Sequence, residues 1–163
     1  MLRVNRILCN IPATALEFGT ISSGANAGEV IQVLGATDTT TRNTTSTSYV
    51  TASNTLSVTI TPSSTANKIF IIMTVNVIGG GTTRGDFTIY RGATNLAANA
   101  GGLMFPFDTD VYDQNGTTTF LDSPNTTSAT TYQMYMKAPN GGTIGTYVNG
   151  NGTNSITVFE IKG

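Results

Sequence analysis

Apolar and polar residues alternate along much of the chain, which is the pattern of half-buried β-strands. Every second residue from Leu56 to Ile60 is apolar, and the same alternation runs through Asp86–Arg91 and Thr130–Lys137. Further strands are expected at Glu29–Val33, Lys68–Ile78, Thr117–Leu121, Thr143–Val148 and Ser155–Lys162, with a short apolar piece at Leu103–Phe107. Turn-forming clusters of Gly, Asn, Ser and Pro separate these stretches at intervals of about ten residues. The pattern predicts an all-β chain with roughly eight to ten strands.

The most apolar stretch is Lys68–Ile78, which begins with five consecutive apolar residues and ends at three glycines. Because both faces of its first half are apolar, we expect this strand to be covered on both sides. By contrast, Thr37–Ser48 is so rich in threonine that it is expected to be a solvated loop. Together these features predict a two-sheet antiparallel β-sandwich of the jelly-roll type.

Residues 1–28 differ from the rest, because their apolar residues follow no clear period. Ser22–Gly28 reads as a flexible hinge, so the chain divides into an N-terminal arm and hinge, 1–28, and a sandwich domain, 29–163. Two interpretations of the arm stay open: a strap on its own domain, or an anchor that docks on another subunit or protein. The docking interpretation assigns the contact to Leu2, Val4, Ile7, Leu8, Ile11, Leu16 and Phe18.

The amino-acid composition excludes several classes of function. Thr, Ser, Asn and Gly make up nearly half of the 163 residues, charged residues are 10%, and the net charge is −1. Such a chain offers no basic surface for nucleic acid, and no apolar run reaches the roughly 18 residues of a membrane-spanning helix. The absence of His excludes Ser-His-Asp and Cys-His nucleophile systems and histidine-ligated metals. We therefore expect a non-enzymatic protein with no cofactor and no nucleic-acid or membrane partner.

Few residues suggest site chemistry. Asp108, Asp110 and Asp113 form the densest carboxylate group, which could hold Ca²⁺, but Tyr112 and the lack of a following Glu break the calcium-loop pattern. A solvated turn or a polar subunit contact is the alternative, and no metal site is assigned. The strand tyrosines Tyr90, Tyr132, Tyr135 and Tyr147 fit core or interface packing, or a platform for sugar rings. Arg84 and Arg91 are expected to pair with Asp86 or Asp122.

Several stretches also resemble a known family. They are Ser46–Val50, Leu56–Pro62, Asn67–Val75, Phe87–Leu96 and Leu121–Lys137. In this order they resemble a β-sandwich domain of tailed phages, especially cyanophages, found at tail-fibre tips and in small virion proteins. The resemblance covers roughly residues 29–163. It implies a trimeric jelly roll similar in shape to the complement globular-head and tumour-necrosis-factor group, and it brings no catalytic residues.

Two functions follow from the resemblance and the size of the chain. The first is a capsid decoration, or cement, protein: a homotrimer on the virion surface, made in the host cytoplasm without a signal peptide. Residues 1–28 would anchor it to capsid or tail proteins, because 28 residues leave no room for a fibre shaft. The alternative is a tail-fibre tip or receptor-binding protein that recognises a host surface glycan.

Overall fold

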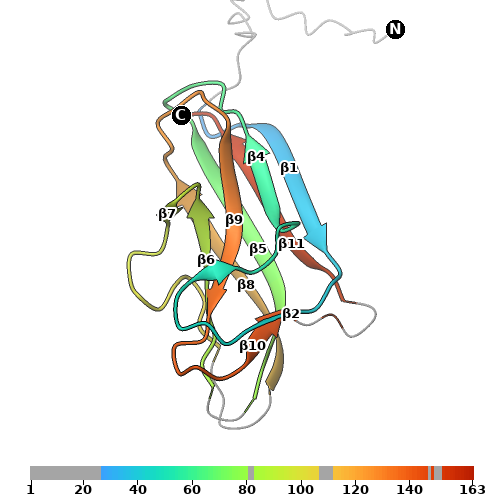
Figure 1. Ribbon diagram of the computed structural model, residues 1–163. Helices are drawn as coiled ribbons and strands as arrows, with labels where there is room; N and C mark the ends of the chain where they lie inside the picture. The colour runs from blue at the N-terminus through green and yellow to red at the C-terminus, as the bar shows by residue number, and fades with distance from the viewer. Residues whose placement is uncertain (1–26, 81–82, 107–111, 147, 149–151) are drawn as a thin grey trace, which may run out of the picture.

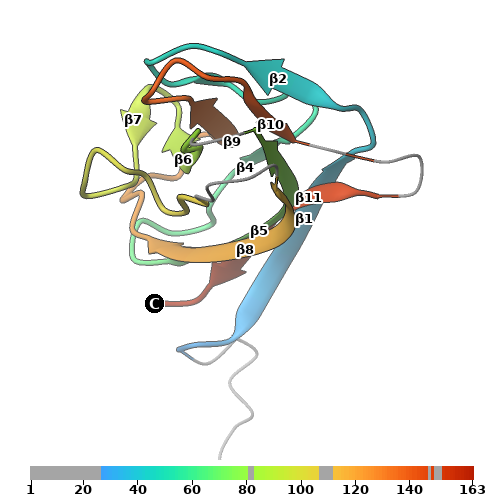
Figure 2. The same ribbon diagram turned by 90° about the horizontal axis from the view of Figure 1, so that it is seen from below.

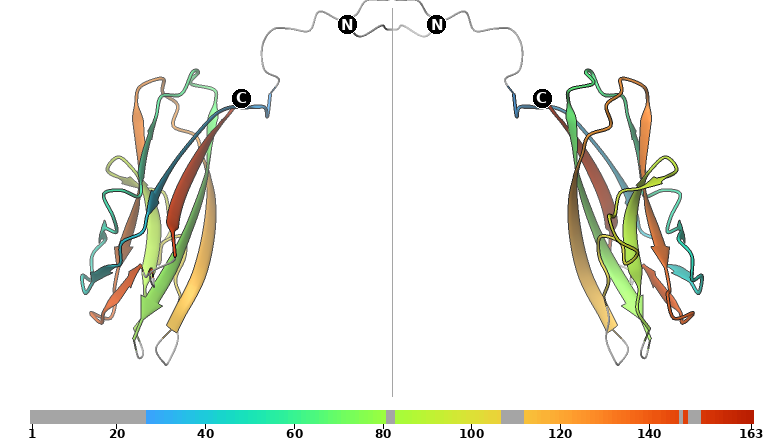
Figure 3. Two further views of the ribbon diagram at one scale, coloured as in Figure 1. Left: turned by 90° about the vertical axis from the view of Figure 1, so that its right-hand side faces the viewer. Right: turned by 90° about the vertical axis from the view of Figure 1, so that its left-hand side faces the viewer.

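The computed structural model is a sandwich of two antiparallel β-sheets, seen edge on in Figure 3. It describes residues 27–80, 83–106, 112–146, 148 and 152–163. Sheet A contains β1 (Val30–Asp38), β2 (Arg42–Thr44), β5 (Lys68–Gly79), β8 (Tyr112–Asp122), β10 (Ile144–Thr146) and β11 (Asn154–Ile161). Sheet B contains β3 (Val50–Thr51), β4 (Ser57–Ile60), β6 (Asp86–Arg91), β7 (Thr94–Asn95) and β9 (Thr130–Lys137).

Sheet A is built around β5, the longest strand. One edge of β5 pairs with β8 over its length, and the other edge pairs first with β11 and then with β10. β1 continues the sheet beyond β11, and β2 continues it beyond β10. The first residues of β1 and the C-terminus therefore lie at the same end of the sandwich (Figure 1).

Sheet B is built around β9, which pairs with β6 on one edge and with β3 and β4 on the other. β6 is joined to β7 by a tight turn at Gly92, whose φ of 56° lies in the left-handed region that favours glycine. Apart from the hairpin of β6 and β7, the strands paired in both sheets come from distant parts of the chain (Figure 2).

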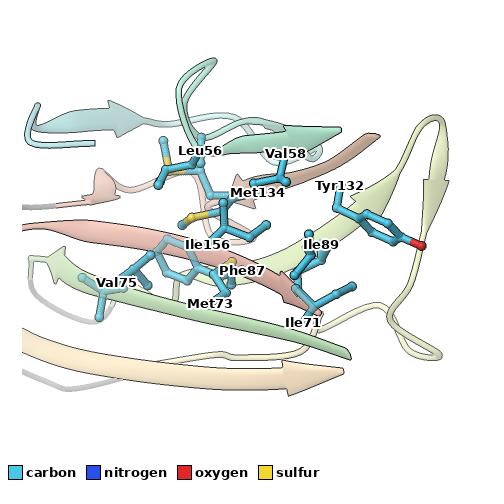
Figure 4. Packing of buried hydrophobic residues seen from close by; sticks show 14 of the residues in the cluster. Leu56, Val58, Ile71, Met73, Val75, Phe87, Ile89, Tyr132, Met134 and Ile156 are labelled. Atoms are coloured by element: carbon cyan, nitrogen blue, oxygen red, sulfur yellow. The ribbon is translucent and has the colours of Figure 1, made fainter. Parts of the chain in front are cut away.

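The core fills the space between the sheets. Sheet A supplies the inward residues of β5, including Ile71 and Met73, and sheet B supplies Phe87, Tyr132 and Met134, all of them fully buried (Figure 4). Alternate residues along each strand point into this layer, as the period of two in the sequence requires. The prediction of an all-β, two-sheet antiparallel sandwich is therefore confirmed.

Individual elements differ from the sequence prediction in places. Strands β6 and β9 have the predicted bounds, whereas β1 and β8 are longer than expected. The solvated-loop prediction for Thr37–Ser48 is wrong in part, because Arg42–Thr44 pairs with β10 as an edge strand. Within the described part of Leu103–Phe107 no strand forms, and Met104 makes only an isolated bridge to Phe87.

Candidate functional site

The two faces of β5 have different environments. Ile69, Ile71 and Met73 point into the core and are fully buried, while Phe70 and Ile72 point outward and are half-buried. No further layer of the described chain covers this outer face, which looks away from sheet B in Figure 3. Within the described part of the chain the strand is therefore covered on one side only, and cover on the second side stays a prediction.

The strand register extends the outward apolar residues into a continuous row. Val33 of β1 pairs with Phe159 of β11, Phe159 pairs with Phe70 of β5, and Phe70 pairs with Leu121 of β8. Residues paired in this way share one face of a sheet, and the rings of Phe70 and Phe159 lie 6.1 Å apart between centroids. The row therefore crosses four neighbouring strands without a polar side chain.

Neighbouring rows define the limits of this surface. Val30 and Ile161 lie beside the row on its terminal side, and Ile72 lies in the next row along β5. We call this group the apolar face; it consists of Val30, Val33, Phe70, Ile72, Leu121, Phe159 and Ile161. One row farther along β5, Thr74 hydrogen-bonds Thr117 at 3.0 Å, and the surface becomes polar.

The apolar face is exposed and nearly uncharged. Leu121 is 57% exposed and Val33 is 53% exposed, values more typical of surface polar residues than of strand aliphatics. Along β1, β5, β8 and β11, outward-facing charged residues occur only at the extremes: Lys68 beside Ile161 and Asp113 opposite Ile78. The Lys68 ammonium donates a hydrogen bond to Ser123 Oγ at 2.7 Å. Between Lys68 and Asp113, the outer face of the described strands carries no charged side chain.

A buried carboxylate fixes the strands beneath the apolar face. Glu160 points inward from β11 and accepts hydrogen bonds from the Ser63 amide, the Asn67 side chain and the Gln32 side chain, each at 2.6 Å. Burial alone would raise the pKa of Glu160, but these donors outweigh it and hold the pKa below its usual value. The carboxylate thus ties β1 and the loop after β4 to β11.

Two further buried carboxylates join the sheets. Asp122 at the end of β8 accepts two hydrogen bonds from Arg91 Nη1, at 2.8 and 2.9 Å, and one from the Tyr132 hydroxyl at 2.7 Å. Burial, together with this bond, raises the pKa of Tyr132 above its usual range. Asp38 at the end of β1 accepts hydrogen bonds from the Ser53 hydroxyl and the Thr40 amide. Burial would raise the pKa of Asp38, but the hydrogen bonds lower it to about 2.

The outer face of sheet B has a different character. Tyr90 and Tyr135 stack with centroids 4.0 Å apart, and Tyr49 meets Tyr90 edge-on at 6.1 Å. The Lys137 ammonium lies 4.6 Å from the centre of the Tyr49 ring and donates to the Ala100 carbonyl at 2.6 Å. Burial, and then the nearby Asp86 charge, raises the pKa of Tyr49 to about 12. These four side chains, Tyr49, Tyr90, Tyr135 and Lys137, therefore contact one another.

The ion pairs expected from the sequence are present. Arg84 Nε lies 2.5 Å from Asp86 Oδ1, and Arg91 pairs with Asp122. Of the predicted tyrosines, Tyr132 is buried in the core, while Tyr90 and Tyr135 are half-buried on sheet B. Tyr147 lies outside the described residues.

Most other predicted site residues also lie outside the described part of the chain. They are the arm residues Leu2, Val4, Ile7, Leu8, Ile11, Leu16 and Phe18, and the loop residues Asp108 and Asp110. Asp113 is described, and it is exposed on β8. Within the residues that the structure describes, no group of three or more His, Cys, Asp or Glu side chains is placed to hold a metal ion.

One hollow lies at the end of the sandwich away from the C-terminus. Its volume is about 520 Å³, and it is lined by Asn43, Ile78, Gly79, Gly80, Thr83, Gly142 and Thr143. None of these lining residues carries a charge or a nucleophile stronger than a threonine hydroxyl. The sequence did not single out this hollow, and its lining offers no paired acid and base.

Comparison of the sequence with protein families and with curated proteins gives no match. No protein-family model matches the sequence, and no curated protein matches it significantly. The structure contains no helix, within the ranges it describes, of the length and hydropathy needed to cross a membrane. The apolar face is the candidate functional site, because the strand register gathers its exposed apolar residues on one surface. The sequence predicts these residues as strand residues but does not show that they share a surface.

Proposed function

We propose that the chain is a non-enzymatic structural protein of a phage particle, displayed on the virion surface as a homotrimer and acting as a capsid decoration protein. The observation that supports this most directly is the apolar face. An exposed, uncharged sheet surface of this kind is typical of assembly rather than of catalysis. The buried carboxylates are each occupied by donors from the same chain, so they serve the fold.

The weakly charged exterior fits the same role. With only 10% charged residues and a net charge of −1, association depends little on ion pairs. Contacts between weakly charged surfaces are less sensitive to salt than contacts between charged surfaces. Residues 1–28 are the proposed anchor to the capsid, through the apolar side chains of the arm. The sandwich domain then projects from that anchor.

Copy number tests the proposal. We expect quantitative mass spectrometry of purified particles of the phage that encodes the chain to give hundreds of copies per particle. Particles lacking the protein should lose capsid integrity at a lower temperature. A ratio of only tens of copies would rule out decoration and leave a tail protein.

Full-length arm variants test the anchor. Ile7→Ser/Leu8→Ser should reduce loading onto particles that lack the protein, because it removes apolar area from the arm. Thr14→Ser, a polar change in the same arm, should load like the wild type. Equal loading of both variants would exclude the arm as the anchor.

The second candidate, a tail-fibre tip that binds a host glycan, is favoured by one feature. Tyr90 and Tyr135 reach the outer surface of sheet B beside Gln133, and aromatic rings with amides are the groups that bind sugars. This function predicts that the purified protein blocks phage adsorption and that Tyr90→Ala/Tyr135→Ala abolishes the block. A protein that leaves adsorption unchanged would remove this candidate.

A further inference from the structure

We propose that the apolar face is the surface through which copies of this chain bind one another. This inference rests on the proposed function in one respect, since it supplies the contact that a surface homotrimer needs. It goes further by assigning that contact to one face of sheet A and to particular residues.

Self-complementarity is the first reason for choosing a second copy as the occupant. Three of the seven large apolar residues that are exposed in the described chain, Val30, Val33 and Leu121, lie on the apolar face, and Ile31 follows Val30 on β1. Of the other three, Leu34 pairs with the buried Val158 and so lies on the opposite side of sheet A, and Val50 and Phe105 lie on separate segments of the chain. Apolar surface is best buried against apolar surface, and within the described residues the largest group of exposed apolar side chains is this face, which a second copy would also present.

The charge pattern is the second reason. Two identical faces bring identical charges near each other, and burying an unpaired charge is costly. The rows from Val33 to Leu121 and from Gly35 to Thr119 contain no charged residue. A copy can therefore meet this face without burying a charge, and Lys68 and Asp113 remain at its rim.

Size is the third reason. With strands about 4.8 Å apart and a rise of about 3.4 Å per residue, four strands and the five residues from Lys68 to Ile72 span roughly 19 by 17 Å, or about 300 Å². Ile31 and Leu34, which are also exposed on β1, add area around the sheet edge. This footprint is smaller than the roughly 800 Å² per partner of a standard interface, so it would be the centre of a larger contact, and its width of four strands suits a folded partner. One extended segment, such as residues 1–26, would cover a strip only one strand wide.

The free edge of β1 supports the same assignment. β1 ends sheet A, and no other described strand pairs with its outer edge. Proteins normally protect a long apolar edge strand, because it otherwise pairs with other chains. Assembly through the adjoining apolar face would protect this edge in the folded protein.

The test is the mass of the full-length protein in solution, measured by sedimentation equilibrium and native mass spectrometry. The wild type should have at least twice the 17.0 kDa mass of the chain, and three times that mass if the copies form the proposed homotrimer. Val33→Thr/Leu121→Thr, which extends the threonine surface of the next rows across the apolar face, should have the mass of a single chain. Val33→Lys/Leu121→Lys should do the same at every accessible protein concentration.

Matched variants separate this result from misfolding and from charge alone. Val50→Lys/Asn54→Lys adds the same charge at exposed positions in β3 and in the loop that follows it, and should keep the wild-type mass. Val33→Thr/Leu121→Thr should retain the β-sheet circular dichroism of the wild type, because both positions are more than half exposed. If its spectrum is lost, the single variant Leu121→Thr on the edge strand β8 takes its place.

Three outcomes overturn the proposal: a monomeric wild type, face variants that keep the wild-type mass, or dissociation of full-length Leu16→Ser/Phe18→Ser. The last outcome would assign the contact to the arm instead. A wild-type dimer that the face variants dissociate supports the face and corrects the trimer. Particle loading is a separate readout, so decoration can fail while the face remains the contact between copies.

Discussion

The two faces of β5 carry similar residues but meet different surroundings. Inward residues such as Ile71 contact sheet B and are fully buried, whereas their outward neighbours Phe70 and Ile72 are only half-buried. Residues of the same chain cover the inner face of β5, whereas the outer face is part of the surface of the described chain. The comparison teaches that apolar residues on both faces of a strand indicate packing on both sides. They do not indicate whether the same chain or another molecule supplies the second packing surface.

The same comparison holds for polar groups. Inward polar residues at the ends of the sheet, such as Glu160 and Asp38, are buried, and each accepts several hydrogen bonds. Outward polar residues, such as Thr74 and Thr117, share single hydroxyl contacts at the surface. The inner face is therefore specified by hydrogen bonds as well as by packing. The outer face is specified by packing alone, which suits an interface between folded copies.

The largest expected effect is on the inner face. Ile71→Ala should lower the free energy of unfolding by about 2–5 kcal/mol, because it leaves a cavity in a closed core. Urea unfolding in the monomeric Val33→Thr/Leu121→Thr background measures this without any contribution from assembly. The matched control is Ile72→Ala, the next residue on the same strand, which should cost about 1 kcal/mol because its side chain is half-buried. Equal losses would mean that the two faces are equally covered within one chain.

Acid should weaken the polar part of the inner face next. The folded-state pKa of Asp38 is about 2 against an unfolded value of 3.8. Its contribution is fully present above about pH 4 and is lost as the pH falls toward 2. At about 1.4 kcal/mol per pKa unit, this amounts to about 2 kcal/mol. Glu160, whose pKa is also lowered, adds a loss in the same direction.

Asp38→Asn tests this loss directly. Urea unfolding of the monomeric background at about pH 7 and about pH 2.5 should show a smaller acid loss in Asp38→Asn than in its parent. Ser53→Ala should give an intermediate loss, because it removes one of the donors that lower the pKa of Asp38. An unchanged acid loss in Asp38→Asn would show that other groups control the pH dependence.

Particular residues show why the sequence predicts some features and not others. The strands β6 and β9 alternate cleanly and are followed by Gly92 and Pro139, so their bounds follow from the pattern. The three residues of β2 are polar, and their pairing with β10 spans about a hundred residues, which no local pattern shows. Glu160 likewise meets Ser63 across 97 positions. The apolar face depends on the register of four strands, and the sequence shows only that each of these strands contains some apolar residues.

A smaller stability effect in a single chain than that of Ile71→Ala is expected at Phe70. A core phenylalanine replaced by Ala typically costs about 3–5 kcal/mol. Phe70 is half-buried and leans on Phe159, so in the monomeric background Phe70→Ala should cost only about 1–2 kcal/mol. In the wild-type background, the urea midpoint should rise with protein concentration, because unfolding is coupled to dissociation. Phe70→Ala should flatten that rise, whereas Val50→Lys/Asn54→Lys should leave it unchanged. A loss of 3–5 kcal/mol in the monomeric background would place Phe70 in a closed core and contradict the difference between the two faces.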